Sequence, residues 1–60
     1  MKCTITIDMD NAAFDGRELA EIAACLKRLV KRIENNTAFY GCSISDTNGN
    51  KVGKFEVTED

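Results

Sequence analysis

The stretch KCTITIDMDNAAFDGREL, residues 2–19, decides the fold because a strand pattern gives way to a helix start within one short loop. Residues 2–9 alternate between apolar and polar side chains, which is the period of a half-buried β-strand. The threonine-bearing phase of this strand is expected to face water, as antiparallel and mixed sheets allow. The side chains expected to face the core are Cys3, Ile5, Ile7 and Met9.

Residues 16–34 are predicted to form the helix, because apolar side chains recur there every three or four positions. Asp15 is the predicted N-cap, and Glu18 three residues later completes a capping-box pair. Phe14 and Leu19 have the spacing of a hydrophobic staple across this start. The predicted core-facing stripe consists of Leu19, Ile22, Ala23, Leu26, Leu29, Val30 and Ile33.

Residues 38–46 and 50–58 are predicted to form a β-hairpin. Asp46 suits the first position of its turn, and Gly49 suits the left-handed position that follows. A regular register would place a lysine against the core, so we expect a β-bulge at Gly53 that restores the apolar phase. The expected opposite pairs are Ile44 with Val52, Cys42 with Phe55, and Tyr40 with Val57.

The whole chain, residues 1–60, is predicted to form a single small α+β domain with the element order β-α-β-β. One helix would pack on one face of a three-stranded mixed or antiparallel sheet. A right-handed crossover from the first strand leaves two strand orders. The first strand lies either antiparallel to the third, giving the order 2-3-1, or parallel beside the second. We favour 2-3-1, because residues 54–57 alternate cleanly enough to pair on both edges.

Sixty residues are near the lower limit for a domain that folds without a metal, a disulfide or a partner. No metal site is expected, because the chain has no histidine and Cys3, Cys25 and Cys42 are widely dispersed. The three thiols are expected to be reduced and buried, in a cytoplasmic protein without a signal peptide. We therefore expect a homodimer that pairs an open edge strand, and no membrane span.

The Asp8-x-Asp10 motif after the first strand resembles the nucleophile motif of haloacid-dehalogenase-like phosphatases. A phosphatase of that type needs further motifs on an extended α/β sheet, which 60 residues do not supply. We expect Asp8 to lie on the solvent face of the strand and Asp10 to turn the chain toward the helix. Without a histidine, a nucleophile–base arrangement or a glycine-rich phosphate loop, neither catalytic activity nor a cofactor is expected.

Two surfaces are candidates for binding. Phe39 is predicted to project from the helix-free side of the sheet near Thr4 and Thr6, where an exposed aromatic marks a contact surface for a protein. A basic patch on the outer face of the helix would instead hold the phosphates of a nucleic acid. The net charge of −2 and the single Tyr make nucleic acid the less favoured partner. The patch consists of Lys27, Arg28, Lys31 and Arg32.

Three segments together resemble a group of small bacteriophage and prophage proteins: TITIDMDNAAF at residues 4–14, a helix containing ELA and LKRLVKRIE within residues 18–34, and TNGNKVGKFEV at residues 47–57. Such proteins pair a strand ending in D-x-DNAAF with an NGN-x-VG hairpin. The resemblance implies expression in an infected or lysogenic bacterium, and it transfers no activity and no functional residue. By analogy with small phage proteins that dock on host machinery, the expected function is to bind a host protein and modulate a host system.

Overall fold

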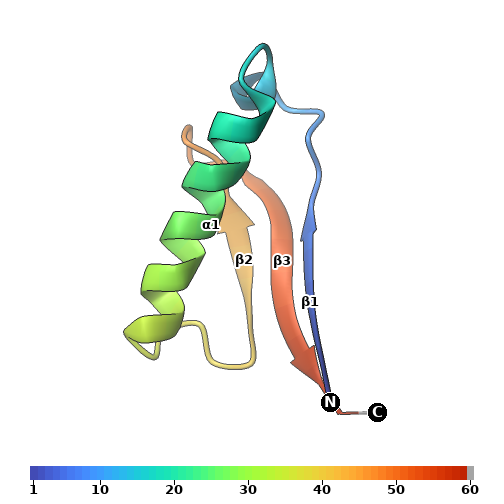
Figure 1. The fold of residues 1–60 in the computed structure, drawn as a ribbon, viewed down its shortest axis with the longest axis vertical. Helices are drawn as coiled ribbons and strands as arrows, with labels where there is room; N and C mark the ends of the chain where they lie inside the picture. The colour runs from blue at the N-terminus through green and yellow to red at the C-terminus, as the bar shows by residue number, and fades with distance from the viewer. Residues whose placement is uncertain (60) are drawn as a thin grey trace.

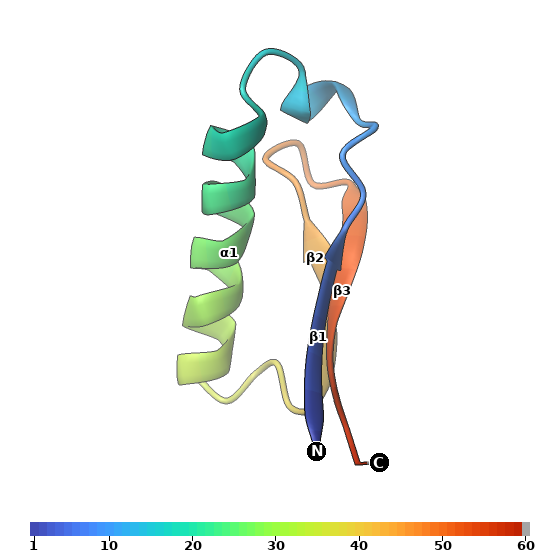
Figure 2. The same cartoon turned by 45° about the vertical axis from the view of Figure 1, so that its right-hand side comes forward.

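The computed structural model describes residues 1–59 and shows one helix packed on one face of a three-stranded antiparallel sheet (Figure 1). The elements are β1 (Lys2–Ile7), the 3-10 helix η1 (Ala12–Phe14), α1 (Glu18–Glu34), β2 (Gly41–Ser45) and β3 (Lys51–Thr58). The sheet has the order β1-β3-β2, which confirms the α+β class and the favoured strand order. Figure 2 shows the helix and the sheet as two separate layers.

The central strand β3 pairs antiparallel with both of its neighbours through its backbone groups. Cys42 lies opposite Phe55, as predicted. The Val57 N–H donates to the Tyr40 carbonyl at 2.8 Å, so this pair also has the predicted register. Ile44 and Phe55 of the apolar phase of the hairpin are buried, whereas Tyr40, which precedes β2, is 77% exposed.

A β-bulge interrupts the β2–β3 pairing one residue away from the predicted position. Ile44 pairs with Gly53, and Ser45 pairs with Lys51, so Val52 is the extra residue. The predicted pairing of Ile44 with Val52 is therefore wrong, although the bulge itself is present. Val52 is buried in this arrangement because the bulge turns its side chain into the core.

The start of α1 differs from the sequence-based expectation. The helix begins at Glu18 after Arg17, whose side chain makes no capping hydrogen bond. Asp15 instead ends the 3-10 helix η1, so its predicted role as the N-cap of α1 is wrong. The predicted staple is also absent, because Phe14 is buried in the core whereas Leu19 is 82% exposed.

A separate turn before α1 explains this difference. The Asn11 side-chain oxygen accepts the Ala13 N–H at 3.0 Å and caps η1. Gly16 then adopts φ 71°, a left-handed conformation that breaks the helical path between η1 and α1. The sequence signal for this turn is the pair Asp15-Gly16, which is typical of turns.

The helix is also rotated about its axis relative to the prediction. Glu21, Cys25 and Leu29 are its buried residues, so only Leu29 of the predicted stripe is buried. The cause is the position of α1 over β2, at one side of the sheet (Figure 1). Ile22 and Leu26 are half-buried, and the exposed residues of the predicted stripe are Leu19, Ala23, Val30 and Ile33.

The core is correspondingly small. Of the three thiols, Cys25 is buried, Cys42 is half-buried and Cys3 is exposed. The expectation that all three would be buried is wrong for Cys3, because α1 does not reach over β1. The buried apolar residues are Phe14, Cys25, Leu29, Ala38, Ile44, Val52 and Phe55.

Candidate functional site

Two consecutive aromatic side chains stand out from the molecule where the chain passes from α1 to β2. Phe39 is 82% exposed and Tyr40 is 77% exposed. With Ile33 and Asn36 they line a hollow of about 390 Å³. We call the surface formed by Ile33, Asn36, Phe39 and Tyr40 the aromatic corner.

The end of α1 fixes one side of the aromatic corner. Asn36 adopts φ 58°, the left-handed conformation that terminates helices. Its N–H donates to the Ile33 carbonyl at 3.1 Å, and the Thr37 N–H donates to the Arg32 carbonyl at 2.9 Å. These two bonds form a Schellman motif, so the turn has a defined backbone.

Phe39 is held in a conformation that its residue type disfavours. Its φ is 55°, in the left-handed region that bulky side chains rarely adopt and that costs about 1–2 kcal/mol. Ala38 before it is fully buried, and the Ala38 carbonyl accepts the Gly41 N–H at 3.1 Å. The backbone is thus fixed on both sides while the Phe39 side chain projects into solvent. Backbone strain at a residue whose side chain is not buried marks a candidate functional residue.

Tyr40 continues the surface onto the sheet. It shares a second hollow, of about 250 Å³, with Met1, Val57 and Glu59. Tyr40 lines both hollows, so it joins the aromatic corner to the end of the sheet.

Thr4 and Thr6, which were predicted to share a contact surface with Phe39, lie on β1. They pair with Glu56 and Lys54 of β3 on the face of the sheet away from α1. Phe39 precedes β2, so the strand alternation that grouped it with the threonines does not apply to it. The structure instead groups Phe39 with the end of α1.

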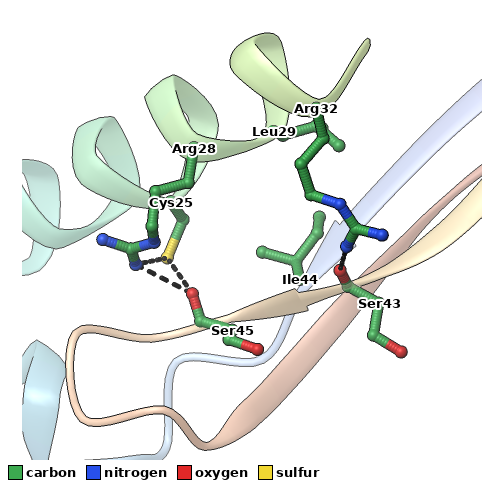
Figure 3. A pocket seen from close by; sticks show the side chains of 7 residues that line it. All are labelled: Cys25, Arg28, Leu29, Arg32, Ser43, Ile44 and Ser45. Atoms are coloured by element: carbon green, nitrogen blue, oxygen red, sulfur yellow. Dashed lines mark hydrogen bonds between the residues drawn. The ribbon is translucent and has the colours of Figure 1, made fainter. Parts of the chain in front are cut away.

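The four residues of the predicted basic patch do not form one surface, because the two arginines turn toward β2 and the two lysines do not. Arg28 donates to the Ser45 carbonyl at 2.8 Å, and Arg32 donates to the Ser43 carbonyl at 3.3 Å (Figure 3). Both arginines therefore reach the outer edge of β2. The groove between α1 and β2 has a volume of about 210 Å³, and its lining includes both arginines but neither Lys27 nor Lys31.

These arginine contacts occupy an edge of the sheet that would otherwise be open. The Tyr40 carbonyl bonds to β3, so the alternate residues Ser43 and Ser45 turn their backbone groups away from β3. Their outward carbonyls accept the guanidinium groups and are not free for another strand. A β2 edge covered in this way is protected against pairing with a further chain.

The Asp8 carboxylate and the Asp10 backbone form the turn after β1. The Asp8 side chain accepts the Asp10 N–H at 3.1 Å, which is an Asx-turn geometry. Asn11, Lys51 and Val52 complete the shallow hollow around them. Within residues 1–59, no group of three or more His, Cys, Asp or Glu side chains is placed to hold a metal ion.

Sequence reasoning missed a buried polar cluster around Glu21. Its carboxylate accepts the Thr47 N–H at 2.8 Å and the Thr47 hydroxyl at 2.6 Å, and it lies 3.6 Å from the Arg28 guanidinium. The Thr47 hydrogen bond lowers the pKa of Glu21 against the opposing effect of burial. The cluster ties α1 to the hairpin turn. No sequence signal identified it, because it joins residues 26 positions apart.

The Cys25 thiol lies beside this cluster and is an inert group. Its sulfur is 3.5 Å from the Ser45 carbonyl, to which it donates, and it is buried. Burial raises the pKa of Cys25 and favours the protonated thiol, although the nearby Arg28 acts in the opposite direction. A buried protonated thiol packs as a small apolar group.

No protein-family model, curated protein or solved structure matches this chain. In the part of the chain that the structure describes, no helix has the length and apolar character that crossing a membrane requires.

Proposed function

We propose that this chain is a small phage-derived accessory protein that acts in the cytoplasm of a host bacterium by binding a host protein. It modulates a host system through this contact and has no catalytic activity of its own. The resemblance of its two ends to small phage proteins supports the origin. The observation that carries the binding function is Phe39, which is both strained and exposed.

The aromatic corner has the features of a protein-binding hot spot. Aromatic side chains are enriched at such sites because they present a large rigid surface with few rotatable bonds. Burying the Phe39 side chain against a partner stabilises a complex by about 2–3 kcal/mol. The hollow beside Phe39 and Tyr40 would receive an apolar side chain of the partner. The expected partner surface is therefore apolar and convex.

The alternative, nucleic-acid binding by the basic patch, has less support. Arg28 and Arg32 are engaged with β2 carbonyls, which leaves Lys27 and Lys31 as the outward charges of the patch. Two phosphate contacts would give a salt dependence with a slope of only about −1.8, which is weak. A gel shift at low salt that disappears in a Lys27→Ala/Lys31→Ala double variant would favour this alternative.

The exchange Phe39→Asn separates binding from folding. Asparagine tolerates the left-handed conformation, so we expect the free energy of unfolding to stay the same or to rise by about 1 kcal/mol. Capture of a protein partner from nuclease-treated lysate of a bacterial host should be lost. Urea unfolding and affinity capture with the tagged chain measure the two effects.

Lys31→Asn is the matched control, because Lys31 is exposed on α1 outside the aromatic corner. It should retain the captured protein at the wild-type level. If Phe39→Asn unfolds more easily than the wild type, Phe39 has a structural role and the proposed function fails. Unchanged capture by Phe39→Asn would equally contradict it.

A further inference from the structure

On the face of the sheet that α1 covers, the part above β1 is left without a covering layer. α1 lies over β2, whereas β1 is at the opposite edge (Figure 1). Ile5 belongs to the phase of β1 that faces the helix layer, because it pairs with the buried Phe55, yet it is 46% exposed. Cys3 on the same phase is exposed as well. An apolar strand face thus meets solvent.

The flank of α1 that borders this face is also apolar. Arg28 and Arg32 lie on one side of the buried line of α1 and reach the outer edge of β2 (Figure 3). The opposite flank therefore points toward β3 and β1. It carries no charged residue, and Val30 on it is 51% exposed. Apolar residues of β1 and of this flank form one surface, which we call the open strip. It consists of Cys3, Ile5, Leu19, Ala23, Leu26 and Val30.

The dimensions of the molecule agree with an uncovered strip. A folded monomer of this mass exposes about 3,900 Å², and this chain exposes 4307 Å². A compact chain of this length has a radius of gyration of about 10 Å, and this chain has 11.7 Å. Both differences have the sign expected for a unit that is completed by another chain.

The space above β1 has the width of one helix. β1 is two strand spacings away from β2, which is about 9.6 Å. Packed helices lie about 8–10 Å apart, so a second helix would fit above β1 beside α1. The chain has one α-helix within residues 1–59, and its flank along the open strip is apolar and uncharged. A second copy supplies a helix of the required kind.

We propose that a second copy of this chain covers the open strip, with the α1 of each copy lying over the β1 of the other. The two copies would bury the same residues, as a two-fold interface requires. The helix wall of the strip runs from Leu19 to Val30, about 17 Å along α1, and the floor and wall are each about 10 Å wide, so covering the strip in both copies removes on the order of 700 Å² in total. An interface of this size belongs to the weak and reversible class, so we expect a dimer that dissociates on dilution.

Pairing of edge strands does not achieve the same burial. The outward carbonyls of β2 are occupied by arginines, so β1 is the open edge. Two β1 strands paired edge to edge would hold the two helices five strand spacings apart, about 24 Å. The open strip would stay in solvent between them. The helix flank and the inner face of β1, and not a strand edge, therefore form the self-association surface.

Val30→Glu tests this surface, because it places a charge on an exposed apolar position of the strip. Glutamate is a better helix former than valine, so the monomer should fold normally. Sedimentation equilibrium from low to high micromolar concentration should give the wild type twice the mass of 6.6 kDa. The variant should stay at the monomer mass, with dimerisation weakened by roughly 100-fold or more.

Lys31→Glu is the matched control, since it adds the same residue at an exposed position outside the strip. It should dimerise like the wild type, and circular dichroism should show the same helix content in both variants. A wild type that remains at 6.6 kDa overturns the proposal, and so does a Val30→Glu variant that dimerises normally. Phe39 lies outside the strip, so neither result bears on the aromatic corner.

Discussion

Gly53→Ala is expected to leave the chain largely unfolded at room temperature. An added Cβ at this position would run into the Thr6 carbonyl oxygen and would lie 3.0 Å from the Ile7 Cα. Both neighbours are backbone atoms of β1, so relief requires β1 to move away from the central strand. A domain of 60 residues has only about 3–9 kcal/mol of stability, and disrupting this pairing removes most of it. Urea unfolding followed by circular dichroism measures the loss.

Two control substitutions test whether the loss comes from the close contact between Gly53 and the backbone of β1. Gly41→Ala brings a Cβ to 3.3 Å from the Phe55 carbonyl oxygen, so we expect a smaller loss of about 1 kcal/mol. Lys54→Ala, at an exposed neighbouring position, should be nearly neutral. Equal stability of Gly53→Ala and Lys54→Ala would show that β1 does not approach Gly53 as described.

Glu21→Ala is expected to be the most destabilising substitution of a charged side chain in α1. It leaves the Thr47 N–H and hydroxyl without their acceptor and opens a cavity under the hairpin turn. We expect the melting temperature to fall by about 10–15 °C. Glu18→Ala is the matched control, because Glu18 is exposed one turn earlier, and it should change the melting temperature little. A similar small change for both would contradict the anchoring role of Glu21.

The same carboxylate makes stability depend on pH. The Thr47 hydrogen bond holds the pKa of Glu21 in the folded chain below its ordinary value of 4.5. The ionised form is therefore favoured by folding, and its contribution is fully present above that value. It is lost as the pH falls below 4.5 and through the lowered pKa. Thermal melts at pH 7 and at pH 3 should differ less for Glu21→Gln than for the wild type.

The strand pattern carried most of the information about the sheet. The alternation of residues 54–57 favoured the order with β3 in the centre, and the sheet has this order. A regular hairpin register would place Lys54 opposite Cys42 in the core, and this conflict predicted a bulge near Gly53. The exact position of the bulge could not be predicted, since an extra residue at either Val52 or Gly53 brings Cys42 opposite Phe55.

The buried face of the helix was harder to predict, because the apolar residues of α1 cover a wider part of its surface than the sheet buries. Leu19 and Val30 fit a core-facing stripe by spacing, yet they lie on the flank that the chain itself does not cover. The buried line contains Glu21, a charged residue that only the distant Thr47 makes acceptable there. Partner groups so far apart in sequence give no periodic signal. The exposure of Phe39 was predicted, but the left-handed turn that places it beside Ile33 was not.

Site-specific photo-crosslinking inside bacterial cells tests most directly whether the aromatic corner binds a host protein. A photoreactive phenylalanine analogue at position 39 should form a covalent adduct with a heavier protein on irradiation. The same analogue at position 31, exposed on α1 but outside the corner, should form no comparable adduct. If position 39 gives no protein adduct above the level of position 31, or crosslinks to nucleic acid instead, the aromatic corner is not a protein-binding surface.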